Sequence, residues 1–385
     1  MIPYSRQSIN SKDILEVKKV LKSNFLTQGK NVEIFEKLIT QISNAKYGVA
    51  VNSASSALHL ACIALGIKKG DRVWTVPNTF VASANCAINC GAIVDFVDID
   101  KNTWNISIEE LEKKLAVSKK KKKLPKLLIP VHFAGQPTEQ KKIWELSKKY
   151  KFKILEDASH SIGATHLKEK TGSCRWSDIT VFSFHPVKII TTGEGGMALT
   201  NNKKFADEMR ILRTNGISQK NFIYKKNKNK PWYYEHQKVG FNYRMNDISA
   251  TLGISQVKRI KEFINKRNLI AKKYQKYLKD YPIKFQLIKK YNTSSFHLLP
   301  IRFDLKKTKM NYKNIFKKFR SSKLFVNLHY MPLHLSPYFK KKGFKKGDYK
   351  NAEEYANSSI SIPIFYDLKE KEVSKISSFI KKFFK

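Results

Sequence analysis

Short apolar runs alternate with segments of helical period along most of the chain, from Asn31 onward. The first four pairs, strand before helix, are YGVAV and SSALHLACIALG (47–66), RVWTV and TFVASANCAINCG (72–91), AIVDFVDI and SIEELEKKLAV (92–117), and KLLIPVHF and TEQKKIWELSKKY (126–150). Continuous apolar strands separated by helices are typical of a largely parallel sheet that helices cover on both faces. We therefore predict an α/β fold, in which ligands bind beyond the carboxyl ends of the strands.

The pattern changes in the second half of the chain. Two more apolar strands are predicted at KFKILED (151–157) and DITVFSF (178–184), followed by a long connecting helix at about 246–280. Beyond it, SSFHLLPIRF (294–303), LFVNLHYMPLH (324–334) and SSISIPIF (358–365) predict strands that alternate with helices in a smaller α+β unit. We predict an N-terminal arm over residues 1–25, a large domain over 26–250, and a linker helix with a small C-terminal domain over 251–385.

The formal net charge of this 385-residue chain is +43 at pH 7, which raises the question of an anionic partner. Only ten of the 74 Lys and Arg residues are Arg, whereas readout of bases favours the Arg guanidinium. The lysine-rich runs 119–123, 225–230 and 340–346 lie in polar segments that we expect to be loops. We therefore favour solvated surface charge and expect no nucleic-acid partner; a basic, non-enzymatic polyanion-binding protein is the alternative.

Targeting and cysteine patterns both favour a soluble cytoplasmic protein. The first residues, MIPYSRQSIN, include no apolar signal region, and no window approaches 18 uninterrupted apolar residues, so we expect neither export nor a membrane partner. The four cysteines form no C-x-x-C pair. Cys86 and Cys90 are four residues apart in a helical segment, but we expect no third ligand near them and no metal site, only buried, reduced thiols.

Polar and aromatic residues stand where several predicted strands end, and the fold class brings such positions together. They are Ser55 and Ser56, Thr79 and Phe80, Asp157 with His160, and Ser183 with Lys188. Each has an ordinary alternative: the serines cap a helix, Phe80 is core, His160 is a structural histidine, and Asp157 forms a salt bridge with a surface lysine. A capped helix start is also a phosphate site, because its free N–H groups attract anions.

Lys188 follows the strand that ends at Ser183 and stands among Val187, Ile189 and Ile190. A lysine held among apolar residues has a lowered pKa and becomes a nucleophile toward carbonyls. An amine, an acid for a pyridine nitrogen, hydroxyls at a helix start for a phosphate, and an aromatic ring for stacking together fit pyridoxal phosphate (PLP). The glycines that follow, Gly193, Gly195 and Gly196, are expected to form a tight turn with close backbone approach.

Nine collinear motifs connect this chain to a known family. They are FLTQG (25–29), NSASSALHLA (52–61), TFVASANC (79–86), DFVDID (95–100), PVHFAGQP (130–137), EDASHSIGA (156–164), SFHPVKIITTGEGGM (183–197), GFNYRMND (240–247) and VNLHYMPLH (326–334). In these motifs the chain resembles the DegT/DnrJ/EryC1/StrS family of PLP-dependent sugar aminotransferases. The resemblance implies the aspartate-aminotransferase fold (fold type I) and an obligate homodimer with active sites at the subunit interface.

The resemblance also implies a role for each matching site residue. Lys188 is implied to form the Schiff base with PLP, Asp157 to contact the pyridinium nitrogen and His160 to contact the ring hydroxyl. Phe80 is implied to stack on the ring. The residues implied to hold the phosphate are Ser55, Ser56, Ser183 and, from the other subunit, Asn242.

Within the family, IPYSRQSI, KSNFLTQG and GFNYRMND are most similar to the pseudaminic acid branch. Members of this branch use L-glutamate to aminate C4 of a UDP-linked 2-acetamido-2,6-dideoxy-4-keto-L-hexose. The residues implied to line the sugar-nucleotide site are Tyr4, Asn24, Phe25, Leu26, Thr27, Asn327, Leu328, His329 and Tyr330. An aminotransferase of another nucleotide keto sugar, or a lyase or epimerase with the same cofactor, is the alternative. The Lys- and Asn-rich segment 219–239 receives no role.

Overall fold

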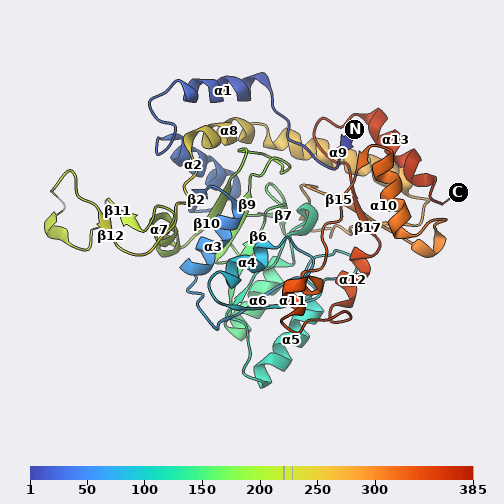
Figure 1. Ribbon diagram of the computed structural model, residues 1–385, viewed down its shortest axis with the longest axis horizontal. Helices are drawn as coiled ribbons and strands as arrows, with labels where there is room; N and C mark the ends of the chain where they lie inside the picture. Colours follow the sequence, from blue (N-terminus) through green and yellow to red (C-terminus); the bar gives the residue numbers. More distant parts are fainter. Residues whose placement is uncertain (220–221, 228, 385) are drawn as a thin grey trace.

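A seven-stranded sheet forms the centre of the molecule (Figure 1). The computed structural model describes residues 1–219, 222–227 and 229–384. In spatial order the strands are β2 (Tyr47–Val51), β10 (Gly196–Thr200), β9 (Ile179–Ser183), β6 (Lys153–Asp157), β5 (Leu127–Leu128), β3 (Arg72–Thr75) and β4 (Ile93–Phe96). The pairs from β9 to β4 are parallel, and β10 is antiparallel to both β2 and β9. The predicted α/β fold with a mostly parallel sheet is confirmed.

Helices cover both faces of this sheet. Successive side chains of each strand point to opposite faces, and in these strands the side chains on both faces are mostly apolar. Val49 and Val181 belong to the apolar cluster of one face, and Ala50 and Phe182 to a cluster on the other. The helices on the first face are α3 (Ala54–Ala64), α4 (Ala82–Ile88) and α7 (Lys203–Leu212); those on the second are α2 (Asn31–Ser43), α5 (Ile108–Lys120), α6 (Gln140–Tyr150) and α8 (Asp247–Val257). Burial on both faces explains the continuous apolar runs in the sequence.

A smaller antiparallel sheet forms the centre of a second unit, from β13 (Ile283–Phe285), β15 (Leu299–Phe303) and β17 (Ser359–Ile362). Three helices share its apolar cluster: α9 (Ile260–Leu278), α10 (Tyr312–Ser321) and α13 (Glu370–Lys381). The first strand, β1 (Ile2–Pro3), pairs in parallel with β16 (Leu324–Phe325), so the start of the chain lies against this unit. The division at residues 25 and 250 stays a prediction.

Shorter elements connect these two units and complete the chain. They are α1 (Ser11–Leu21), β7 (Thr165–His166), β8 (Glu169–Lys170), β11 (Ile217–Ser218), β12 (Glu235–His236), β14 (Asn292–Thr293), α11 (Pro337–Lys340) and α12 (Lys350–Ala356). Helix α1 packs against α8, and the β11–β12 hairpin projects from the body of the molecule beside α7 (Figure 1). Of the hairpin segment 219–239, residues 220, 221 and 228 lie outside the described part of the chain.

The single long helix predicted at 246–280 is wrong, because the chain forms two helices, α8 and α9. Between them, Arg259 has a φ of −105° and a ψ of 6°, outside the helical range. Its guanidinium lies 2.5 Å from the Oδ2 atom of Asp13, which is fully buried at the start of α1. A tertiary contact with a distant segment therefore lies at the break between α8 and α9. The hydrophobic periodicity of the sequence could not predict this break.

The strand predicted over 324–334 is also wrong beyond its first two residues. Only Leu324 and Phe325 form a strand, and Asn327 makes one isolated bridge with Ser361. From Leu328 to Pro332 the chain is irregular, and a short 3-10 helix follows at Leu333–Leu335; the side chains of Asn327, His329 and Tyr330 line the cavity described below. Leu324, Val326 and Leu333 of the segment are buried, whereas Phe325 and Met331 are exposed.

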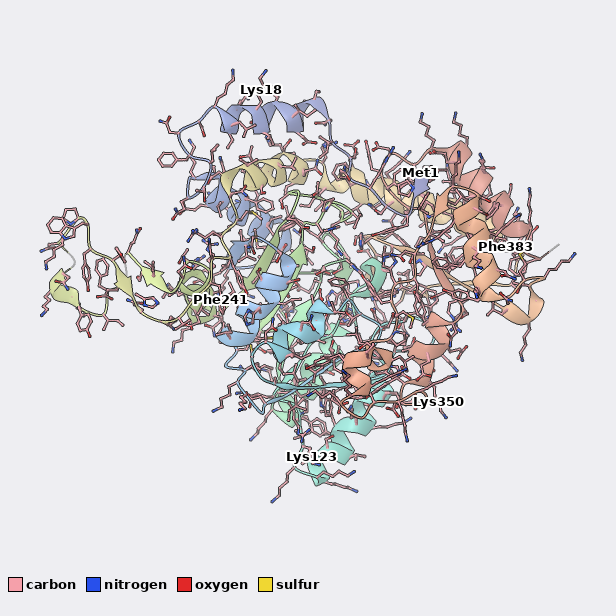
Figure 2. All side chains as sticks on the ribbon, in the orientation of Figure 1. Met1, Lys18, Lys123, Phe241, Lys350 and Phe383 are labelled. Carbon is pink, nitrogen blue, oxygen red and sulfur yellow. The ribbon has the colours of Figure 1, made fainter. Side chains whose placement is uncertain are left out.

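Lysine side chains project from opposite ends of the molecule, as Lys18 and Lys123 illustrate (Figure 2). All five residues of the run 119–123 are exposed, and the run begins in the last turn of α5 and not in a loop, as predicted. Exposure of this kind fits the interpretation of the charge as solvated.

The four cysteines are free thiols. Cys62 lies against both Cys86 and Cys90, although the spacing in the sequence led us to expect no third potential ligand. Within the described residues, no group of three or more His, Cys, Asp or Glu has an arrangement that could hold a metal ion. In the same part of the chain, no helix is both long enough and apolar enough to cross a membrane.

Candidate active site

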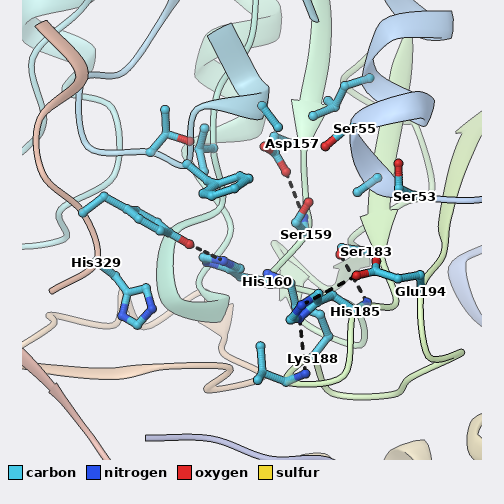
Figure 3. A pocket seen from close by; sticks show the side chains of 18 of the residues that line it. Ser53, Ser55, Asp157, Ser159, His160, Ser183, His185, Lys188, Glu194 and His329 are labelled. Atoms are coloured by element: carbon cyan, nitrogen blue, oxygen red, sulfur yellow. Dashed lines mark hydrogen bonds and ion pairs between the residues drawn. The ribbon is translucent and has the colours of Figure 1, made fainter. Parts of the chain in front are cut away.

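A cavity of about 670 Å³ lies where β6 and β9 end and α3 begins. Such a volume is typical of a site for a cofactor or a small ligand. Figure 3 shows Asp157, His160, Ser183 and Lys188 around this cavity. Of the residues singled out from the sequence, those that line it are Tyr4, Ser55, Thr79, Phe80, Asp157, His160, Ser183, Lys188, Asn327, His329 and Tyr330.

Lys188 lies five residues after the end of β9, in a turn where its backbone N–H donates to the carbonyl of His185 at 2.9 Å. The residue as a whole is partly exposed, but its amine is surrounded by protein atoms. Burial lowers the pKa of Lys188 to about 8, and the negative charge of Asp157 opposes part of that shift. About one tenth of the amine is therefore unprotonated at pH 7, far more than for a lysine with the usual pKa, and this fraction can attack a carbonyl carbon.

Asp157 ends β6 and is 5% exposed. Its Oδ2 accepts a hydrogen bond from the Ser83 hydroxyl at 2.6 Å, and its Oδ1 accepts one from the backbone N–H of Ser159 at 3.1 Å. Among the described residues, no lysine or arginine forms an ion pair with this carboxylate, so the alternative of a structural salt bridge is wrong. The carboxylate is held in place by neutral donors and stays available to a cation in the cavity.

His160 lies behind the cavity with both ring nitrogens engaged. The backbone N–H of Ala134 donates to Nδ1 at 3.3 Å, so the ring hydrogen is on Nε2, which lies 3.2 Å from the Tyr330 hydroxyl. Burial holds the pKa of His160 well below its usual range, and the positive charge of Lys188 lowers it further. The imidazole is therefore neutral and can donate from Nε2 to an oxygen in the cavity.

The start of α3 forms another wall of the cavity. Ser53 caps the helix, because its hydroxyl accepts the backbone N–H of Ser56 at 3.1 Å. The Ser56 hydroxyl donates to Oδ1 of Asn52 at 2.7 Å and is not part of the lining, whereas Ser53 and Ser55 are. First-turn N–H groups of a helix have no partner within it, so they can bind an anion such as a phosphate.

Gly196 permits this wall to form. A Cβ atom at this position would lie 2.5 Å from the backbone nitrogen of Ala54. Only glycine therefore allows β10 to approach the first turn of α3 so closely, which agrees with the close backbone approach expected for the glycine run.

Several predicted residues lie outside the cavity formed by this single chain. Asn242 is exposed and makes an isolated bridge with Thr214, while Leu328 packs into the apolar cluster beside Trp74. The residues after α1, namely Asn24, Phe25, Leu26 and Thr27, are exposed. For these residues and for Ser56, the implied roles stay predictions.

The cavity also contains residues that the sequence pattern did not single out. Ser159, His185 and Glu194 line it, and the Nε2 of His185 lies 3.8 Å from a carboxylate oxygen of Glu194. The Nε2 of His297 lies 3.5 Å from the Nζ of Lys188. His297 stands in an apolar run of the sequence, which is the same signal that singled out Lys188.

These side chains fit PLP by their chemistry. A buried amine with a lowered pKa, a carboxylate without an ionic partner, and a neutral imidazole surround one cavity. Hydroxyls at the start of α3 and the half-exposed ring of Phe80 complete the lining. Together they match the aldehyde, the pyridine nitrogen, the ring hydroxyl, the phosphate and the ring face of that cofactor.

Comparison with known proteins agrees with this chemistry. The chain matches the DegT/DnrJ/EryC1/StrS aminotransferase family over residues 7–381. It is 36% identical over 384 residues to an uncharacterised protein of Methanocaldococcus jannaschii, covering 99% of this chain and 97% of the relative. It is also 36% identical over 375 residues to the UDP-4-amino-4,6-dideoxy-N-acetyl-beta-L-altrosamine transaminase of Campylobacter jejuni, covering 97% of this chain and 94% of that relative.

Solved structures of the same family share the fold. PseC of Helicobacter pylori, described as an aminotransferase involved in pseudoaminic acid biosynthesis, has a TM-score of 0.89 at 30% identity and covers 100% of this chain and 99% of its own. A Streptococcus pneumoniae protein in its PMP form has a TM-score of 0.90 at 26% identity, covering 100% and 99%, and a PLP form is also known. The chain therefore belongs to the DegT/DnrJ/EryC1/StrS family and is a PLP-dependent sugar aminotransferase.

Proposed function

We propose that the chain transfers the amino group of L-glutamate to C4 of a UDP-linked 2-acetamido-2,6-dideoxy-4-keto-L-hexose. The product is UDP-4-amino-4,6-dideoxy-N-acetyl-β-L-altrosamine. The observation that carries the proposal is the single cavity that contains Lys188, Asp157 and His160 together with Tyr4 and Tyr330. The similarity to the Campylobacter jejuni transaminase and to PseC, over nearly the whole length of each chain, supports the choice of substrate.

Lys188 performs the proton transfers in this proposal. PLP supplies the aldehyde that carries the amino group and a ring that accepts electrons. The Nζ atom of Lys188 takes a proton from Cα of L-glutamate in the first half-reaction and delivers one to C4 of the keto sugar in the second. A pKa of about 8, lowered by burial, suits a group that must both accept and donate a proton near neutral pH.

The other residues hold and orient the cofactor. Asp157 accepts a hydrogen bond from the protonated pyridine nitrogen, and its own hydrogen bonds from Ser83 and Ser159 keep the carboxylate in one orientation. His160, neutral because burial lowers its pKa, donates from Nε2 to the ring hydroxyl oxygen. Phe80 stacks on the ring, and the proposed phosphate ligands are Ser55 and Ser183 with the first turn of α3.

The sugar side of the cavity is formed by the start of the chain and the irregular segment after β16. The rings of Tyr4 and His329 lie 5.0 Å apart, and Asn327 and Tyr330 complete this wall. Burial lowers the pKa of His329 to about 3, with a further contribution from the charge of Lys188, and burial raises the pKa of Tyr4. Neutral side chains that hydrogen-bond without carrying charge suit a neutral sugar ring and exclude water from it.

The proposal includes a homodimer whose sites are completed by the partner subunit. Large apolar side chains are exposed along α1 and the segment after it, and again on the hairpin segment: Ile14, Leu15, Leu21, Phe25, Leu26, Ile223, Tyr224, Trp232, Tyr234 and Val239. Exposed apolar surface of this extent is typical of a protein interface. Asn242 is exposed next to this hairpin, where it could serve a partner's phosphate site and not its own.

The test is to incubate the purified protein with PLP, L-glutamate and a panel of UDP- and dTDP-linked keto sugars. We expect an amino sugar, and 2-oxoglutarate beyond one equivalent per active site, only with the UDP-4-keto-L-hexose, with NMR showing nitrogen at C4 in the altro configuration. Amination of a different sugar, or amination at C3, would show that the proposed substrate is wrong. If no sugar in the panel sustained 2-oxoglutarate release beyond one equivalent per active site, the proposal would be contradicted. Free thiols favour the cytoplasm as the place where this reaction occurs.

A further inference from the structure

A second buried base, His297, contacts the amine of Lys188 and has no part in the function proposed above. Its Nε2 lies 3.5 Å from Nζ of Lys188, and the residue is 2% exposed. The rings of His297 and His160 are 4.4 Å apart, and His160 lines the cavity. The other ring nitrogen of His297, Nδ1, has no hydrogen-bond partner among the described residues. The contact with Lys188 is therefore the one polar contact recorded for this ring.

The backbone on both sides of His297 is held firmly. Arg267, which is 2% exposed, donates to the carbonyl oxygen of His297 at 3.1 Å and to that of Ile364 at 2.9 Å. The Ser295 hydroxyl donates to the carbonyl oxygen of His160 at 2.9 Å. A Cβ atom at Gly135 would lie 3.0 Å from the backbone nitrogen of His297, so the two segments are in close contact. The imidazole thus has a fixed anchor, unlike the flexible lysine that it contacts.

The protonation state of His297 determines what it can offer to that lysine. Burial holds the pKa of His297 well below its usual range, and the groups that face it lower it further: Lys188, His160, Arg267 and His329. The ring is therefore neutral and has one nitrogen that accepts a hydrogen bond. An ammonium group has three donors and no acceptor, so Nε2 is suited to accept from the protonated Lys188.

We propose that His297 is a positioning residue for Lys188, accepting a hydrogen bond from Nζ whenever that amine is not joined to the cofactor. The inference rests on the proposed function, in which Lys188 is released by the amino acid and then transfers protons. A free lysine side chain has four rotatable carbon–carbon bonds and many rotamers. The fixed imidazole limits these rotamers and keeps the released amine beside the reacting carbon.

The test measures Lys188 in cofactor-free protein, so that no turnover is needed. Lys188 is acylated with a small amine-reactive reagent, and the rate of acylation is measured against pH by mass spectrometry of the peptide that contains Lys188. The proteins compared are the wild type, His297→Phe, His297→Leu and His297→Gln. Loss of an acceptor destabilises the ammonium form, so we expect the pKa of Lys188 to fall by about one unit in the Phe and Leu variants. Gln keeps an acceptor oxygen, so we expect the pKa of Lys188 in His297→Gln to stay close to that of the wild type.

His166→Phe is the matched control, because His166 is also a buried histidine but contacts Asn292 and not the cavity. We expect it to leave the Lys188 profile unchanged. An unchanged profile in folded His297→Phe or His297→Leu, or an equal shift in His166→Phe, would overturn the proposal. In single turnovers with cofactor and L-glutamate, His297→Phe is expected to lower the rate constant of the half-reaction about tenfold or more and to leave the half-saturating glutamate concentration nearly unchanged. Failure of the wild type to aminate any sugar would contradict the proposed function and leave the acylation result intact.

Discussion

At the scale of single residues, environment distinguishes Lys188 from a chain full of lysines. Most lysines are exposed, as the run 119–123 is, whereas the amine of Lys188 is enclosed between β9 and the segment that contains His297. Burial lowers its pKa to about 8. The same reasoning applies to Asp157, whose carboxylate meets the Ser83 hydroxyl and no cation among the described residues.

Replacing Lys188 with alanine tests this residue directly. We expect Lys188→Ala to lose borohydride-fixed PLP, because no other described lysine lines the cavity, and to lose turnover by about 10²- to 10⁴-fold, which is the range that general acid–base catalysis contributes. Mass spectrometry after reduction and a glutamate-dependent assay measure the two effects. Lys203→Ala, on the exposed start of α7, is the control and should retain both properties. A reduced cofactor adduct in Lys188→Ala would contradict the assignment.

At the scale of elements, one buried carboxylate attaches α1 to α8. Asp13 is fully buried and accepts the Ser255 hydroxyl at 2.6 Å, the Gln256 side-chain amide at 2.8 Å and the Arg259 guanidinium at 2.5 Å. It also completes a capping box with Asn10 at the start of α1. The segment after α1 leads directly to residues predicted for the sugar-nucleotide site, so the attachment of α1 affects their position.

Removal of this carboxylate should destabilise the protein measurably. In Asp13→Ala, the donors of α8 and Arg259 lose their partner in a buried position, and we expect the free energy of unfolding to fall by about 3–5 kcal/mol. Chemical denaturation measures this change, and limited proteolysis should then cut near α1. Glu16→Ala, which removes an exposed ion pair with Lys19 on the same helix, is expected to leave the free energy of unfolding nearly unchanged. Equal effects of the two substitutions would contradict a special role of Asp13.

At the scale of the whole molecule, the surface combines dispersed positive charge with concentrated apolar side chains. Lysines project from opposite ends (Figure 2), whereas the exposed large apolar residues include several on α1 and on the hairpin segment. Dispersed charge keeps a protein soluble, and a concentrated apolar surface is typical of an interface with another copy. The exposed Asn242 lies in the chain directly after this hairpin.

Mixing two inactive variants tests whether the sites are shared. We expect Asn242→Ala to bind PLP weakly and Lys188→Ala to be inactive. In a mixed dimer, the site with an intact Lys188 receives an intact Asn242 from the partner, so one of its two sites works. Random reassembly should therefore recover about one quarter of wild-type activity. Light scattering should show a dimer throughout. No recovery in confirmed mixed dimers would show that Asn242 serves its own chain.

Local patterns predicted those parts of the site that depend on neighbours in the sequence. Lys188 and Asp157 were identified because each is polar beside an apolar strand, and chain order together with the fold class placed their strand ends at one edge of a sheet. The Ser83–Asp157 bond and the His297–Lys188 contact were missed. His297 is 109 residues from Lys188 along the chain, and no periodicity encodes such a contact.

The sequence by itself determined six of the seven strands of the large sheet, their mostly parallel order and the family, and it predicted Lys188 as the reactive lysine; β10 was missed. These features follow from hydrophobic periodicity and from short motifs, which are local properties of the chain. Only the tertiary structure decided the break at Arg259, the irregular wall after Phe325 and the imidazole that faces Lys188. Each of these features is stabilised by contacts between segments that are distant in the sequence. Local sequence patterns therefore cannot predict them.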